Sequence, residues 1–321
     1  MKSKMVCFLV AILVGVTSVG YTQVKDYPKN PIQIVLGHSA GGGIDIFYRL
    51  VAEGLARKWK VPVNILNKAQ ASGAVAADEV ARADKDGYTM LGNLVGPLAT
   101  LTIANPKSPI NLLRDFEPIE MHSYAAQVLL VNADSKFKSY DELIDYARKK
   151  PGELLCAVSD IGSNLHLEML LFQRSSNVKF TLVHHEGTQE IIAGLLGRHF
   201  DTGYVNDVVA TPFVAAGKMR AIVSDIKSPL GCPTFAEKGY PQVNLPPIMA
   251  LMGPKGLPPA IIKTWEDAIG EIVKDPNFAA SMKKLNYTIT MTVGREKLAK
   301  AIKEEFDKYA RFTPEELGWK K

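Results

Sequence analysis

The chain has 321 residues, of which 47% are hydrophobic and 22% charged, a composition typical of a globular protein long enough for two domains. Its formal net charge is +5, and Lys2 and Lys4 at the N-terminus supply two of these charges. The remaining excess is too weak and too evenly spread to indicate a nucleic-acid-binding protein.

Residues 1–20 have the pattern of a secretory signal peptide. The two lysines are followed by an apolar run of 12 residues, Met5 to Val16, and then by the small residues Ser18-Val19-Gly20. A membrane-spanning helix needs about 20 predominantly apolar residues, so this run is too short for an anchor. We expect a periplasmic protein whose signal peptide is cleaved near Gly20.

The next stretch predicts a strand, a glycine loop and a helix. The β-branched run Ile32–Leu36 precedes Gly37-His38-Ser39-Ala40-Gly41-Gly42-Gly43, and apolar residues recur at helical spacing from Ile44. Backbone N–H groups at such a helix N-terminus favour an anion, either a carboxylate or a phosphate. The candidate ligand-binding residues here are His38, Ser39, Gly41, Gly42, Gly43 and Asp45, of which Asp45 suits the first helical turn as a cap.

Strand and helix then alternate. We predict strands over 61–66 and 88–91 with a helix over 72–83 between them, and Asn93 at the end of the last strand is a further candidate residue. This alternation is typical of a parallel sheet covered by helices. Residues 94–115 carry scattered proline and asparagine, and we expect a loop region there.

A second alternating series follows a capping box, Ser139-Tyr-Asp-Glu142. Strands are predicted over 154–158, 179–184 and 200–204, each followed by a polar loop and a helix. We expect Ser163 and Thr188 to act as N-caps. The candidate ligand-binding residues of these loops are Ser159, Gly162, Ser163, Glu186, Gly187, Thr188 and Asn206.

Two α/β series predict two lobes. The proline-rich segment Pro229–Pro247 leads to an apolar strand from Ile248, and the helices after it have no sheet of their own. The chain should therefore return to its first lobe. The predicted fold is a two-lobed α/β clamshell, with lobe one formed by 27–125 plus 248–321 and lobe two by 126–247. Each lobe should hold a mainly parallel sheet flanked by helices, with the ligand at the carboxyl ends of the strands.

The letters Gly37-His38-Ser39-Ala40-Gly41 also match the G-x-S-x-G elbow of serine hydrolases. Ser39, however, follows the first strand, so no earlier strand is available to supply an oxyanion loop, and no Asp–His pair stands out. The chain also lacks nucleotide-binding glycine motifs and metal-ligand spacing among its six histidines. We predict no catalytic residue, no metal and no cofactor.

The two cysteines beyond the signal peptide, Cys156 and Cys232, leave open both a disulfide bond and two free thiols.

The chain resembles the substrate-binding protein of tripartite tricarboxylate transporters, a family of periplasmic solute receptors, from about Tyr27 to Phe312. The matching features are, in order, Pro31-Ile32, Gly41–Asp45, Asp86–Thr89, Gly162-Ser163 with His166-Leu167, Gly187, Ala216–Arg220 and Pro233–Glu237. The resemblance implies a clamshell that closes over a small carboxylate, held by N–H groups of the glycine loop and of loops in lobe two. It also implies delivery to membrane subunits without catalysis, and we expect a monomer.

Three positions differ from what the resemblance implies. The family often has an aromatic residue at His38, a lysine at Glu186 and an aspartate at Val205, all in predicted cleft loops. Glu186 would either face solvent or meet a hydroxyl or cationic group of the ligand. Two other functions are weighed against transport: ester hydrolysis by Ser39, and presentation of a bound ligand to a membrane sensor.

Overall fold

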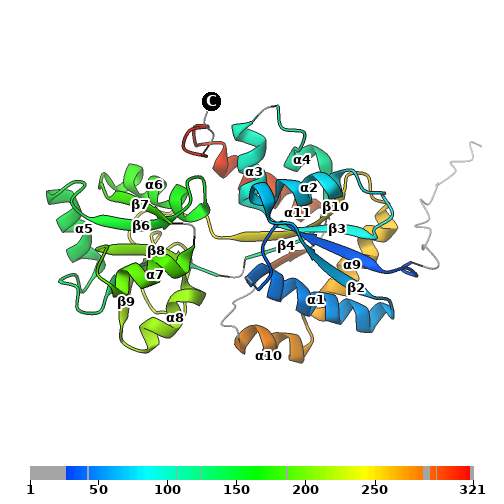
Figure 1. The fold of residues 1–321 in the computed structure, drawn as a ribbon, viewed down its shortest axis with the longest axis horizontal. Helices are drawn as coiled ribbons and strands as arrows, with labels where there is room; N and C mark the ends of the chain where they lie inside the picture. Colours follow the sequence, from blue (N-terminus) through cyan, green and yellow to red (C-terminus); the bar gives the residue numbers. More distant parts are fainter. Residues whose placement is uncertain are drawn as a thin grey trace, which may run out of the picture.

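The structure is a computed structural model that describes residues 27–318 except 42, 106, 124, 186, 285–289 and 294. The predicted signal peptide, Gly42 and Glu186 lie outside the described residues. Within the described part of the chain, no helix is long and apolar enough to cross a membrane. The strands form two sheets, one on each side of a narrow connection (Figure 1).

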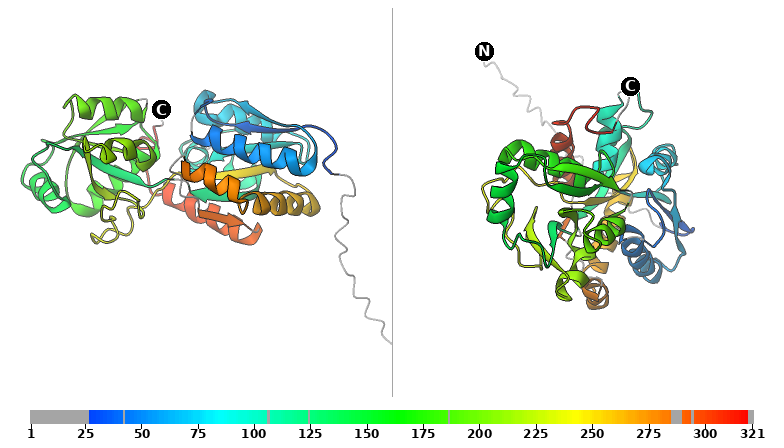
Figure 2. Two further views of the ribbon diagram at one scale, coloured as in Figure 1. Left: turned by 90° about the horizontal axis from the view of Figure 1, so that it is seen from below. Right: turned by 60° about the vertical axis from the view of Figure 1, so that its left-hand side comes forward.

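The larger sheet has six strands in the order β11-β4-β10-β3-β1-β2. Its strands are β1 Ile32–Leu36, β2 Val63–Asn67, β3 Thr89–Leu94, β4 Phe116–Ser123, β10 Ile248–Pro254 and β11 Thr290–Val293. Helices cover both faces (Figures 1 and 2). The helices that accompany it are α1 Gly43–Trp59, α2 Ala74–Ala81, α3 Val95–Ala104, α4 Leu112–Asp115, α9 Pro259–Ile272, α10 Pro276–Lys284 and α11 Arg295–Tyr309, with a short 3-10 turn at Gln70–Gly73.

The two faces of this sheet have separate cores because successive side chains of a strand point to opposite faces. Ile34 and Leu36 of β1 pack with α1, α9 and α10, whereas Val35 between them packs with α2 and α3. Both faces are therefore apolar, which explains the nearly continuous hydrophobic runs of the central strands.

The smaller sheet has five strands in the order β7-β6-β8-β5-β9. Its strands are β5 Gln127–Asn132, β6 Leu155–Ser159, β7 Thr181–His185, β8 Thr202–Asn206 and β9 Met219–Ser224. Its helices are α5 Tyr140–Lys149, α6 Asn164–Ser176, α7 Thr188–Leu196 and α8 Asp207–Ala215. The serine half of the predicted capping box is present at α5, where the Ser139 hydroxyl accepts a hydrogen bond from the Glu142 N–H at 3.3 Å, while the Glu142 carboxylate accepts from the Lys138 N–H at 2.6 Å.

The two-lobed α/β fold is confirmed, but each sheet is mixed and not mainly parallel. β1 pairs in parallel with β2 and β3, whereas β10 is antiparallel to both β3 and β4. In the smaller sheet, β5 is antiparallel to β8 and β9. The reason is topological: β5 and β10 enter their sheets directly from the other lobe, without the crossover helix that makes neighbouring strands parallel.

The loop predicted over 94–115 is wrong, because ten of its residues form helix α3. The sequence Val95-Gly-Pro-Leu-Ala-Thr-Leu-Thr-Ile-Ala104 is apolar on all sides, so it has no helical periodicity to detect. Pro97 lies in the first turn, where a missing N–H costs the helix nothing. The helix packs against α11, and this burial replaces the amphipathic signal.

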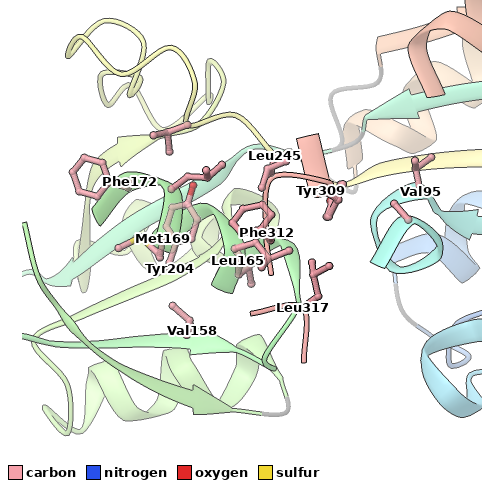
Figure 3. Close-up of a cluster of buried hydrophobic side chains, with 14 of the residues drawn as sticks. Val95, Val158, Leu165, Met169, Phe172, Tyr204, Leu245, Tyr309, Phe312 and Leu317 are labelled. Atoms are coloured by element: carbon pink, nitrogen blue, oxygen red, sulfur yellow. The ribbon is translucent and has the colours of Figure 1, made fainter. Parts of the chain in front are cut away.

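The C-terminal residues cross to the smaller sheet. Tyr309, Phe312 and Leu317 belong to one buried cluster with Leu165 and Leu245, as Figure 3 shows. After α11 the chain follows α6, where Arg174 forms an ion pair with Glu316 and lies 5.6 Å from the centre of the Phe312 ring. Residues 312–318, predicted to belong to lobe one, thus contact lobe two.

The described cysteines are free thiols. Cys156 is buried in β6 and Cys232 is half-buried in the segment after β9.

Candidate functional site

The predicted site residues of lobe one follow parallel strands whose carboxyl ends share one edge. β1 lies between β2 and β3 in parallel register, so the residues after Leu36, Asn67 and Leu94 are neighbours. After β1 the chain forms β2 on one side of β1, and it then returns to form β3 on the opposite side of β1. This makes the gap between β1 and β3 the topological switch point, the place where open α/β sheets bind ligands.

The glycine loop at this edge is fixed by Asp45. Gly41 has φ +79°, and its N–H donates to Asp45 Oδ2 at 2.9 Å. The same carboxylate accepts from Arg49 Nε at 2.8 Å and from Asn67 Nδ2 at 2.9 Å, and Asn67 Nδ2 also donates to the carbonyl of His38 at 3.0 Å. Burial alone would raise the pKa of Asp45, but these donors outweigh it and hold the pKa below its usual value. Asp45 therefore anchors the loop as a carboxylate.

His38 and Asn93 meet across the switch point. His38 Nε2 lies 2.9 Å from Asn93 Oδ1, which also accepts the N–H of Leu94 at 2.8 Å. Asn93 is completely buried, while His38 is partly exposed. Burial lowers the pKa of His38 more than the Asn93 hydrogen bond raises it, so the ring is neutral at physiological pH.

Lobe two repeats this arrangement. β6 lies between β7 and β8 in parallel register, and its switch point falls between β6 and β8. Ser159 and Asn206 end these two strands. Ser163 caps α6 as predicted, with its hydroxyl accepting from the His166 N–H at 3.2 Å.

The loop before α6 is fixed by a second neutral histidine. The Gly162 N–H donates to His166 Nδ1 at 3.1 Å, which requires an unprotonated nitrogen. Burial, with a smaller contribution from His184, lowers the pKa of His166 to about 4. His166 lies in α6 and was predicted only as part of the family resemblance, not as a residue that orients the loop.

Three helices begin at these edges without a side-chain cap. The N-caps of α3, α7 and α8 are Leu94, Gly187 and Asn206, and none of their side chains accepts a hydrogen bond from the first turn. The prediction that Thr188 caps α7 is wrong, because Thr188 is already the first helical residue.

At α8, however, the first helical residue is the buried Asp207, whose carboxyl accepts from the N–H groups of Ala126 and Val208. The N-termini of α3 and α7 have no such side-chain acceptor and carry partial positive charge toward their surroundings.

The two edges approach one another. A Cβ placed on Gly96, just after β3, would lie 2.8 Å from Oδ1 of Asn164, at the start of α6. Val208, at the start of α8, packs against the apolar cluster of lobe one that contains Ile44. The loops predicted from sequence in lobe one are therefore close to those in lobe two.

Two predicted residues have other roles in the structure, and one was missed. Ser39 is exposed and forms no hydrogen bond to any described residue, and the neighbouring His38 is bonded to Asn93, so no catalytic triad is assembled. Val205 does not lie in a cleft loop, because it is completely buried in β8 among core residues. Asn67 was not predicted as a site residue, although it is the last residue of β2 and Asn93 is the residue before the last of β3. Glu186 and Gly42 lie outside the described residues.

These features define a class of protein. Two α/β lobes joined by crossing strands, with both switch points turned toward one another, are the architecture of two-lobed solute-binding proteins.

The comparisons identify the family. Residues 47–316 match the model of the tripartite tricarboxylate transporter family receptor, and the chain belongs to this family. Protein BugT of Bordetella pertussis is 32% identical over 253 residues, which cover 77% of this chain and 78% of BugT. The chain is therefore a solute-binding receptor of the periplasmic binding type and not an enzyme.

Two solved structures share the fold. MatC from Rhodopseudomonas palustris with bound malate is 24% identical with a TM-score of 0.72, over 89% of this chain and 99% of that one. A second R. palustris protein, solved with adipate, is 22% identical with a TM-score of 0.76, over 91% and 99%.

Proposed function

We propose that this receptor captures a small carboxylate between the two switch-point edges and delivers it to the membrane subunits of a tripartite transporter. The observation that carries the proposal is the pair of helix N-termini without a side-chain acceptor, α3 in one lobe and α7 in the other. Such N–H groups bind carboxylates without any charged side chain. The malate and adipate in the related structures support the same ligand class.

The finer parts of the proposal concern location and assembly. We propose that residues 1–20 direct export and are removed near Gly20, and that the mature chain works as a monomer in the periplasm. The two lysines followed by a short apolar run support the signal peptide, and membership of a transporter receptor family supports the periplasmic location. The assay is uptake of labelled carboxylate by cells that carry the membrane subunits with and without this chain; uptake that does not need the chain would contradict delivery.

Binding is tested on the mature chain by thermal shift and calorimetry with succinate, malate, adipate and citrate. Ligand at about 100 times its dissociation constant should add about 2.7 kcal/mol of stability. Succinamide, which has the shape of succinate without its charges, is the control and should cause no shift. If none of the acids raises the melting temperature, the proposed ligand class is wrong.

The backbone N–H groups are tested at Thr188, the first residue of α7. Proline is well tolerated at this position and removes one N–H donor, and Gly187 before it already has the extended backbone that a proline requires. Thr188→Pro should weaken carboxylate binding about tenfold, the value of one charge-assisted hydrogen bond. Thr188→Ala, which keeps the N–H and loses the hydroxyl, is the matched control. Equal affinity of the two variants would exclude the N-terminus of α7 from the site.

A further inference from the structure

The amide of Asn93 is held in one orientation by its surroundings. The side chain is completely buried and lies against two glycines of neighbouring loops. A Cβ added to Gly37 would lie 2.6 Å from Asn93 Nδ2, and one added to Gly73 would lie 2.7 Å from it. These distances are too short for any side chain, so the amide occupies the space that both glycines leave.

The hydrogen bonds identify which end of the amide is oxygen. The backbone N–H of Leu94 can only donate, and it points to Asn93 Oδ1 at 2.8 Å. His38 Nε2 contacts the same oxygen at 2.9 Å, so this nitrogen must carry the hydrogen. In a neutral ring the other nitrogen, Nδ1, then has a free lone pair and can only accept. The lowered pKa of His38 agrees with a neutral ring.

The pair therefore leaves one acceptor, His38 Nδ1, and the two N–H donors of the Asn93 amide without a partner within the described ranges. His38 Nδ1 has no hydrogen-bond partner among the described residues. The NH2 group of Asn93 is buried and likewise has no partner in the described part of the chain. A buried, unpartnered polar group costs about 1–3 kcal/mol unless a bound molecule satisfies it.

The position of the pair places it within the proposed ligand site. Asn93 and His38 flank the switch point of lobe one, and a Cβ added to Gly96 in the first turn of α3, which follows β3 directly, would lie 2.8 Å from Asn164 Oδ1 of lobe two. A ligand held there meets N–H donors from the helix N-termini, which suit carboxylate oxygens. It also meets the imidazole lone pair of His38, which repels a carboxylate oxygen and requires a hydrogen on the ligand.

We propose that the ligand carries a hydrogen-bond donor, a hydroxyl or ammonium group, beside a carboxylate, and that His38 Nδ1 accepts this hydrogen. The ligand class is thus a hydroxy or amino carboxylate in preference to a plain one. This proposal rests on the proposed function and makes His38 a residue that determines specificity.

The test compares acids that differ in a single group. Calorimetry on the mature chain measures succinate, malate, aspartate and 2-methoxysuccinate, the last of which keeps the ether oxygen and lacks the hydrogen. The same comparison is made for the plain and 2-hydroxy acids of five and six carbons, so the result does not depend on chain length. Malate or aspartate, or the corresponding 2-hydroxy acid, should bind about tenfold more tightly than the plain and methoxy acids.

Two variants of His38 separate its two nitrogens. A glutamine side chain can place its amide N–H where His38 Nε2 lies and keep the bond to Asn93, but it has no acceptor at the position of Nδ1. His38→Gln should therefore abolish the preference for hydroxy and amino acids over plain acids. Asn can place its oxygen near Nδ1, so His38→Asn should keep part of the preference. Because His38 is partly exposed, both variants should fold, which circular dichroism verifies.

The outcomes are distinguishable. If plain and methoxy acids bind the wild type as tightly as the hydroxy and amino acids, the proposal is overturned while carboxylate binding stands. A preference that persists undiminished in His38→Gln also overturns it, because the donor is then recognised elsewhere. If no carboxylate binds at all, the proposed function fails first and this proposal with it.

Discussion

The carboxylate of Asp45 should be the main electrostatic support of the glycine loop. Its side chain is 3% exposed and accepts hydrogen bonds from Gly41, Arg49 and Asn67. In Asp45→Asn one oxygen can still accept from Asn67, but the new NH2 group faces the N–H of Gly41 and the guanidinium of Arg49. One charge-assisted bond is lost, worth about 1.5–3 kcal/mol, whereas the exposed Arg49 can turn to water at little cost. We expect a loss of about 2 kcal/mol in the free energy of unfolding.

A matched control lies on the next helix. Asp78 and Arg82 form the same i,i+4 pair as Asp45 and Arg49 with the same 2.8 Å distance, but the Asp78 side chain is 38% exposed. Exposed pairs of this kind contribute about 0–0.5 kcal/mol, so Asp78→Asn should be nearly neutral. Urea unfolding of both variants, followed by circular dichroism at pH 7, measures the difference.

The pH dependence gives an independent check. The pKa of Asp45 is lower in the folded protein than its ordinary value of 3.8, so its stabilisation is present above that value and is lost as the pH falls through the folded pKa. The gap between wild type and Asp45→Asn should therefore narrow below about pH 4. Equal costs of Asp45→Asn and Asp78→Asn, or a gap that stays constant down to pH 3, would refute this account of the loop.

Two further predictions concern lobe two. Gly162→Ala should lower the melting temperature and weaken ligand binding, because Gly162 has φ +83° and the new Cβ would lie 2.4 Å from the Leu317 carbonyl oxygen. The control Gly231→Ala, with φ +74° and no atom within 4 Å, should show only the smaller backbone cost of about 1 kcal/mol. Equal decreases in the melting temperatures of the two variants would contradict the role of the Leu317 contact. Burial raises the pKa of Asp225 to about 7 from its ordinary value of 3.8, so the folded form holds its proton more tightly and its contribution to stability falls as the pH rises from about 4 to about 7. Asp225→Asn keeps an oxygen that accepts from the N–H groups of Gln127 and Ile226 and replaces the buried Oδ2, which has no partner among the described residues, with an NH2 group. The free energy of unfolding of this variant, measured by urea unfolding, should therefore not fall between about pH 4 and about pH 7. A variant with the same pH dependence as the wild type would disprove the raised pKa of Asp225.

The positions of the site loops could be predicted because local signals suffice for them. Glycines, a helix-capping serine and an alternation of strand and helix indicate where each strand ends, and the parallel register of β1, β2 and β3 brings those ends together. The bond between His38 and Asn93 could not be predicted, because it joins residues 55 positions apart and depends on the strand order. The same holds for the contact between Gly162 and the C-terminal segment, which requires the chain to cross between the lobes.

Helix α3 and strand β10 show where sequence patterns fail for a physical reason. Helix α3 has no charged residue on any side, so its periodicity disappears although its stability does not. Strand direction is likewise invisible in a buried apolar run such as Ile248–Pro254, because parallel and antiparallel neighbours bury the same side chains. Both features depend on neighbours that only the folded chain supplies.

Under the proposed function, the two lobes contribute different kinds of recognition. In lobe two, α7 offers backbone N–H groups, which do not depend on the side chain present and therefore suit the carboxylate common to many ligands. In lobe one, the His38 ring is oriented by Asn93, so a single substitution at position 38 changes what the site accepts without changing the fold. A charged side chain is not needed to hold the anion in this arrangement, and selectivity among acids can then depend on a few side chains at the switch point of β1 and β3.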